Sequence, residues 1–138
     1  MRYKTFIFLS VTWGGLLTFF GLIVYAAMRA LGHVPKRHGY CVYFEIGRGW
    51  GGLEFGPIFL ANRSPSEYIL DHELGHGYQN CLLGPFFLII MLASAARYNA
   101  RKIQKKLCPK RPLSPYDSAW FERWATRLGR AAMGRREA

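Results

Sequence analysis

The sequence predicts an α+β fold behind an N-terminal transmembrane helix, and three observations support this. An uncharged apolar run of 24 residues lies near the start of the chain, two runs rich in aromatic and β-branched residues follow it, and the remaining half carries helix signals. Because the chain has 138 residues, of which 51% are hydrophobic, we expect one small domain. We assign residues 1–31 to a membrane anchor and residues 32–138 to the domain.

The apolar run TFIFLSVTWGGLLTFFGLIVYAAM, residues 5–28, is the predicted anchor. As a single helix rising about 1.5 Å per residue, it exceeds the roughly 30 Å of hydrocarbon in a bilayer. A cleaved signal peptide is the alternative, since the chain opens with the basic MRYK. The run is longer than the apolar core of about 7–15 residues typical of signal peptides, and no small-residue cleavage site follows it. We therefore favour the anchor.

Positive charge is concentrated towards the C-terminus. The net charge is +11, and residues 97–138 hold twelve Lys and Arg against three acids. No groove-reading motif accompanies these charges, so we expect no nucleic-acid partner. Beside an anchor they favour contact with lipid headgroups and a domain in the cytoplasm, in a bacterium at the inner membrane. Cys41, Cys81 and Cys108 are widely spaced and odd in number, which indicates free thiols.

Two strand-like runs predict a β-hairpin over residues 40–61. YCVYFEI (40–46) and LEFGPIFLA (53–61) are rich in aromatic and β-branched residues, and GRGWGG separates them. Pro57 has no backbone N–H to donate to a neighbouring strand. We therefore expect the second strand to lie at an edge of the sheet.

The next segment predicts a helix over residues 65–82. Ser64 is a favourable N-cap, Pro65 suits the first helical position, and Glu67 completes a capping box. Gly84 and Pro85 mark the place where this helix ends or bends.

Two further helices are predicted, over residues 86–106 and 115–128, the second after another Ser-Pro start signal. The apolar block within residues 82–96 decides whether the two halves of the domain lie on one side of a membrane. Its longest uninterrupted apolar run has eleven residues, whereas a spanning helix needs about 20. We therefore predict a buried or re-entrant helix, which leaves both halves on the same side.

The segment DHELGH, residues 71–76, carries a metal-binding pattern. On a helix, His72 and His76 lie one turn apart on the same face, so both imidazoles can reach one ion. Glu73 lies about 100° round the helix and can act as a base on a water bound to that ion. The spacing predicts Zn²⁺ as cofactor. A pair of histidines that binds no metal is the alternative.

Glu122 is the candidate for the third ligand that such a site needs. On the last predicted helix it belongs neither to the apolar face nor to the basic face, and it shares a strip with small residues: Ser118, Ala125 and Gly129. Small residues, like Gly75 and Gly77 in the histidine helix, allow another helix to come close. His33 and His38 are alternative ligands, and an exposed Glu122 paired with an arginine is the reading without metal.

HELGHGYQNCLLGPFFLI and the later FERWATRLG resemble a group of small bacterial membrane-associated proteins with an HExxH motif. The resemblance covers about residues 52–95 and 114–130. It implies a zincin-like helical core and a gluzincin-type zinc metallopeptidase that cleaves a peptide or protein substrate. It also implies the site residues, namely Glu73 as general base and His72, His76 and Glu122 as ligands.

The resemblance implies a further feature and has one departure. The strand over residues 53–61 resembles the edge strand to which an extended substrate adds by backbone hydrogen bonds. Gluzincins commonly carry Asp four residues after the ligand Glu, where this chain has Thr126. A hydroxyl can accept a hydrogen bond from an imidazole N–H but brings no charge. Asp71 is an alternative source of that support.

Residue type alone nominates candidates to stabilise an oxyanion: Tyr78, Tyr98 and Tyr116. Because the supporting acid is missing, a second function stays open. In that reading the chain is a non-catalytic membrane protein, structural or partner-binding, with a degenerate or structural metal site. Its oligomeric state does not follow from the sequence.

Overall fold

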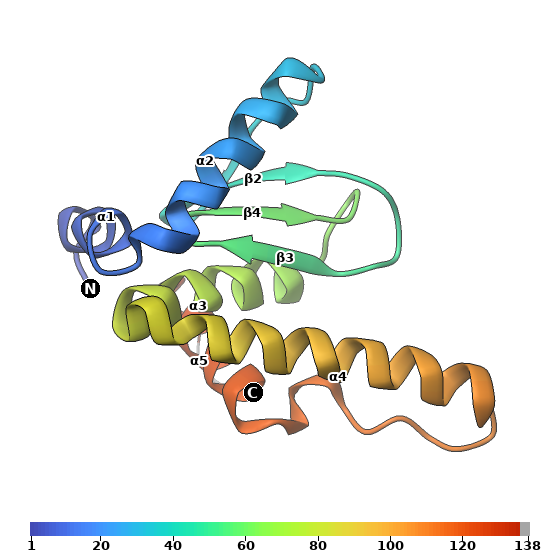
Figure 1. Cartoon of the computed structure of the whole chain (residues 1–138). Coiled ribbons are helices and arrows are strands. Elements are labelled where there is room, and N and C mark those ends of the chain that lie inside the picture. The colour runs from blue at the N-terminus through green and yellow to red at the C-terminus, as the bar shows by residue number, and fades with distance from the viewer. Residues whose placement is uncertain (136–138) are drawn as a thin grey trace.

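The computed structural model describes residues 1–135, which form a mixed α+β fold with a four-stranded sheet. Helix α2 covers one face of the sheet, and α3 lies against the other, with α5 and α4 beyond it (Figure 1). The elements in chain order are α1 (Tyr3–Val11), α2 (Gly15–Ala30), β1 (Lys36–His38), β2 (Cys41–Glu45), β3 (Gly52–Phe55), β4 (Ile58–Ala61), α3 (Glu67–Leu83), α4 (Phe87–Leu107) and α5 (Trp120–Ala132).

The predicted single anchor helix is wrong in its shape, because the chain forms two helices, α1 and α2, bent by 94°. The break falls where two glycines, each costing about 1 kcal/mol in a helix interior, follow Trp13. Gly14 also permits a close contact, since a Cβ there would lie 2.3 Å from the side-chain nitrogen of Asn80 in α3. The helix is therefore interrupted at this point, and the bend packs closely against α3.

The sheet also differs from the predicted hairpin. Its strand order is β1-β2-β4-β3, and β2 pairs in parallel with β4, with Val42 opposite Ile58. The hairpins are instead β1–β2 and β3–β4, because the run over residues 53–61 contains two strands separated by a turn at Gly56 and Pro57. Gly56 has a φ of 72°, which glycine adopts without strain. Strand β3 is one of the two edges of the sheet, and β4 lies between β2 and β3. The edge-strand prediction therefore holds for the first half of the run and is wrong for the second.

The helices of the second half differ from prediction at their starts, and α5 also ends four residues later than predicted, at Ala132. Helix α3 is capped by Ser66, whose hydroxyl accepts a hydrogen bond from the Ile69 N–H at 3.3 Å, and not by Ser64. Helix α4 lies within one residue of its predicted bounds. Helix α5 begins at Trp120, five residues later than predicted, because residues 116–118 form a short 3₁₀ turn first.

Helices α3 and α4 join at a 3₁₀ turn over Gly84–Phe86, where the chain changes direction (Figure 1). The ring of Phe87 lies 5.8 Å from that of His76, whereas eleven residues of straight helix would separate them by about 16 Å. By length and composition alone, the segment Glu67–Leu107 could cross a membrane, and the bent α1–α2 pair passes the same test within the described residues. Phe87 and Ile90 are buried, so one face of α4 packs inside the domain.

Candidate metal centre

Helix α3 carries the two motif histidines into the interior of the domain. Every residue from Asp71 to Cys81 is buried, because the sheet covers one side of the helix and α5 lies against another. His72 and His76 are 5% and 7% exposed. A helix enclosed in this way can present imidazoles to a site that excludes most bulk water.

Helix α5 approaches α3 through two glycines. A Cβ on Gly75 would lie 1.8 Å from the carbonyl oxygen of Ala125, and a Cβ on Gly129 would lie 1.6 Å from that of Asp71. The two backbones are therefore in direct contact, as the strip of small residues predicts. This contact brings Glu122, which is fully buried, over the histidine pair.

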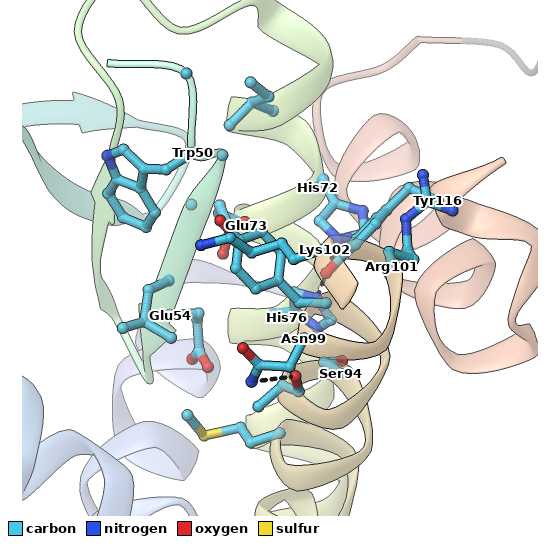
Figure 2. Close-up of a pocket in the computed structure, with 18 of the residues that line it drawn as sticks. Trp50, Glu54, His72, Glu73, His76, Ser94, Asn99, Arg101, Lys102 and Tyr116 are labelled. Carbon is cyan, nitrogen blue, oxygen red and sulfur yellow. Dashed lines mark hydrogen bonds between the residues drawn. The ribbon is translucent and has the colours of Figure 1, made fainter. Parts of the chain in front are cut away.

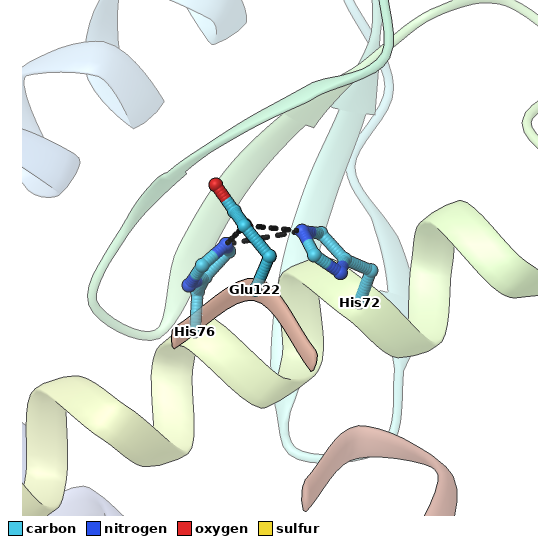
Figure 3. Close-up of side chains that lie close together, drawn as sticks. All are labelled: His72, His76 and Glu122. Carbon is cyan, nitrogen blue, oxygen red and sulfur yellow. Dashed lines mark hydrogen bonds and ion pairs between the residues drawn. The ribbon is translucent and has the colours of Figure 1, made fainter. Parts of the chain in front are cut away.

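Three side-chain atoms converge at this contact (Figure 3). His72 Nε2 lies 3.1 Å from Glu122 Oε2, His76 Nε2 lies 3.2 Å from the same oxygen, and the two Nε2 atoms are 3.1 Å apart. Ligands about 2.0–2.1 Å from a tetrahedral zinc ion lie about 3.3 Å from one another. The donor set and its spacing therefore fit a zinc ion.

The outer hydrogen bonds of His72 fix which of its nitrogens faces Glu122 as an acceptor. The Thr126 hydroxyl donates to the backbone carbonyl of Glu122 at 3.2 Å, so it must accept from His72 Nδ1, 2.9 Å away. In the neutral ring, Nε2 then carries a lone pair. Thr126 thus takes the orienting place predicted for it.

The hydrogen bonds of His76 fix its tautomer in the same way. The amide nitrogen of Gln79 donates to the carbonyl oxygen of Phe121 at 2.8 Å, which leaves the amide oxygen to accept from His76 Nδ1 at 2.8 Å. Two lone pairs and a carboxylate oxygen therefore face one another. Such an arrangement requires a cation between them, either a proton or a metal ion.

The charges of these groups depend on one another. Burial raises the pKa of Glu122, but the nearby imidazoles of His72 and His76 outweigh it and hold that pKa well below its usual range. Burial lowers the pKa of His76, and Glu122 reverses this effect and raises it. Glu122 Oε1 accepts a hydrogen bond from Ser94 at 2.6 Å, whereas Oε2 has no well-directed hydrogen bond within residues 1–135. That buried oxygen is the atom aimed at the histidines.

Asp71 and His38 do not belong to this cluster. Asp71 Oδ1 lies 2.8 Å from His38 Nε2, and its Oδ2 accepts from Arg135 at 2.9 Å. These contacts occupy both oxygens of Asp71 away from the ligand atoms. Asp71 therefore does not support a metal ligand, and His38 is not a ligand, so both alternatives are wrong. His33 is also absent from the cluster formed by the described residues.

Glu73 lies beside the cluster in a cavity of about 960 Å³ (Figure 2). The cavity opens between the edge strand β3 and helix α4, and His72 and His76 line it. Burial raises the pKa of Glu73. A Cβ on Gly52 of β3 would lie 2.3 Å from Glu73 Oε1, so glycine at this position makes room for the carboxyl group.

The three tyrosine candidates differ in whether they line the cavity. Tyr116 lines the cavity with its ring 5.8 Å from that of His72, and burial together with Glu122 raises its pKa, so its hydroxyl stays protonated. Tyr98 also lines the cavity. Tyr78 instead packs on Phe6 in the apolar core, with ring centroids 5.2 Å apart, so it cannot serve the site.

Sequence reasoning missed three site residues: Glu54, Gln79 and Ser94. Glu54 is 3% exposed and lines the cavity, and neither carboxyl oxygen has a hydrogen-bond partner in the described chain. Strand alternation could have found it, because it points to the opposite face from Leu53 and Phe55. Helical spacing could have linked Gln79 to His76, three residues earlier. Ser94 has no local signal, since its role depends on the turn between α3 and α4.

Comparison with known proteins finds no matching family model, no similar curated protein and no similar solved structure. The geometry of this site is therefore the basis for assigning a function to the chain.

Proposed function

We propose that this protein is a zinc metallopeptidase with a minimal zincin-like core of gluzincin type. One observation carries the proposal: His72 Nε2, His76 Nε2 and Glu122 Oε2 converge within 3.2 Å of one another, beside Glu73 and an edge strand. Glu73 is held outside the ligand set but in the same cavity. This division of roles suits hydrolysis, which needs both a metal site and a separate base.

The residues of the chain suggest a mechanism. An extended peptide adds to the free edge of β3, which brings a scissile carbonyl over the cluster. Zinc, when bound, would polarise that carbonyl and lower the pKa of a water molecule. Glu73 accepts a proton from the attacking water and passes it to the leaving amine, while the Tyr116 hydroxyl donates a hydrogen bond to the oxyanion.

A non-catalytic metal site is the second candidate, and the residue at position 126 favours it. His72 is oriented by the neutral Thr126 hydroxyl and His76 by the neutral Gln79 amide. Neutral partners make the imidazoles less basic ligands than a carboxylate partner would. In this reading the ion stabilises the α3–α5 contact without turnover.

Glu73→Gln separates the two candidates. If Glu73 is the base, the variant keeps its zinc and loses at least about a hundredfold of its peptidase rate on a quenched-fluorescence peptide library, since general-base catalysis contributes about 10²–10⁴-fold. Glu67→Gln, the same change at an exposed acid of α3 outside the cavity, is the control and should retain most of the rate. Peptidase activity that survives Glu73→Gln would contradict the assignment, and absence of activity from a zinc-loaded wild type would favour the structural site.

We also propose that the protein attaches to a lipid membrane through a shared apolar surface. Trp13, at the bend between α1 and α2, contacts Phe86 at the start of α4, with ring centroids 6.4 Å apart. The exposed apolar side chains on these helices include Leu16, Phe19, Phe20, Ile23, Leu82, Phe86, Ile89 and Leu92. Burying such side chains in a bilayer is favourable by roughly 1.5–3 kcal/mol each. An inner-membrane site and a cytoplasmic domain stay predictions from the charge bias.

A further inference from the structure

We infer that the site selects polypeptide segments with acidic side chains on the side that faces α4. This inference rests on the proposed function, because it assumes a peptide lying along β3. It follows from the distribution of charge around the cavity. Four cations line it, all of them on α4 among the described residues: Arg101, Lys102, Lys105 and Lys106. The two acids that line it, Glu54 and Glu73, lie on β3 and α3 (Figure 2).

Arg101 is occupied by the protein itself. Its guanidinium donates to the carbonyl oxygen of Ser114 and lies 5.6 Å from the ring centroid of Tyr116. These contacts tie α4 to the segment before α5. Arg101 therefore has a structural role, and the recognition of a ligand falls to the lysines.

The three lysines form no ion pair within residues 1–135. Lys102 Nζ lies 5.3 Å from the ring centroid of Tyr98, which holds it at the cavity wall. Like charges four residues apart on a helix, such as Lys102 and Lys106, repel each other. The helix dipole favours lysines in the last turn, but it does not favour their placement along a cavity. An anionic ligand would relieve this repulsion.

The spacing of the lysines matches an extended peptide. Lys102 and Lys106 are four residues apart, which is about 6 Å along the helix axis. Alternate side chains of an extended strand project to the same side about 6.6 Å apart. A peptide paired with β3 can therefore offer two acidic side chains, at positions i and i+2, to the two ends of this lysine row.

A peptide accounts for the row better than an anionic lipid surface does. The lysines line the same cavity as His72 and Glu73, so a ligand that contacts them also reaches the candidate chemistry. Ile103 and Leu107 are exposed beside the row, but the surface proposed to contact the membrane is formed at the other end of α4 by Phe86, Ile89 and Leu92, at least ten residues earlier. Lipid headgroups are accordingly the alternative that the experiment has to exclude.

The test measures binding to the full-length Glu73→Gln protein by fluorescence anisotropy, so that turnover plays no part. The probes are an extended peptide with Glu at alternate positions and the same peptide with Gln there. We expect the Glu peptide to bind about tenfold more tightly, and we expect salt to remove the preference. Replacing all three lysines by Gln should abolish it. A control with three exposed cations replaced outside the cavity should keep it: Arg37→Gln, Lys110→Gln and Arg111→Gln.

Three outcomes would overturn the inference: equal binding of both peptides, no binding of either, or a triple-lysine variant that keeps its preference. Loss of binding to vesicles of anionic lipid in the triple-lysine variant, with peptide binding unchanged, would assign the row to the membrane instead. Zinc content measured on the same samples separates the two proposals. A protein without zinc that still prefers the Glu peptide would refute the proposed chemistry and leave the charge recognition intact.

Discussion

Each histidine of the cluster is oriented by one neutral side chain, and this determines what the cluster can bind. With Nδ1–H donated outward to Thr126 or Gln79, both Nε2 lone pairs face Glu122. The HExxH spacing predicted that the two imidazoles share a face. It could not predict their tautomers, because those depend on partners three residues away in one case and fifty-four in the other.

Glu54 gives a prediction about pH at the scale of a single residue. Burial, and then the neighbouring Glu73, raise its pKa well above 4.5. Glu54 therefore holds its proton more tightly in the folded chain than in the unfolded chain. Between the ordinary and the raised value, folding takes up a proton, so the free energy of unfolding falls as the pH rises.

Glu54→Gln removes this titration while keeping the shape of the side chain. Urea unfolding of wild type and variant across a pH series should show stability falling more steeply in wild type above about pH 4.5. Because Glu54 and Glu73 interact, the difference between the two proteins reports the titration of Glu54 together with its coupling to Glu73. Parallel pH profiles would show that Glu54 does not titrate differently on folding.

At the scale of elements, the contact between α3 and α5 determines where Glu122 lies. Gly75→Ala or Gly129→Ala places a Cβ less than 2 Å from a backbone oxygen of the facing helix. Overpacking of this kind costs typically 1–3 kcal/mol, and a backbone contact cannot relax by a change of rotamer. We expect each variant to lose about 2 kcal/mol or more of stability in urea unfolding, and zinc affinity with it.

Gly15→Ala is the matched control, since a Cβ there meets nothing within 4 Å. It should leave stability within about 1 kcal/mol of wild type. Gly75→Ala behaving like Gly15→Ala would mean that the helices are not in backbone contact.

Some features of these helices and strands could be predicted from the sequence, and others could not. Small residues around Glu122 predicted the close approach of two helices, because a strip without side-chain bulk is a local property of one helix. The hairpin prediction failed because strand propensity did not reveal a turn at Gly56, although the Gly-Pro pair is a strong turn signal. The parallel pairing of β2 with β4 depends on long-range packing. The bend between α1 and α2 likewise depends on contacts with α3.

At the scale of the whole molecule, the apolar surface around the α1–α2 bend predicts how the protein sits on a bilayer. Ile89 lies on this surface, whereas Ile103 is equally apolar but belongs to the basic half of α4, and both are exposed. In a Cys108→Ser background, the Ile89→Cys variant should be protected from a water-soluble maleimide once vesicles are added. The Ile103→Cys variant should stay reactive. Equal labelling at both positions would contradict membrane contact through this surface.

We propose that one zinc ion binds between two histidines of α3 and one glutamate of α5. Elemental analysis of the dialysed, folded protein measures this zinc. We expect about one zinc per chain in wild type and in Glu67→Ala, a control that removes an exposed acid from α3, and a large loss in His72→Ala and Glu122→Ala. Full zinc occupancy in folded Glu122→Ala would contradict the account, because the third ligand would then lie elsewhere.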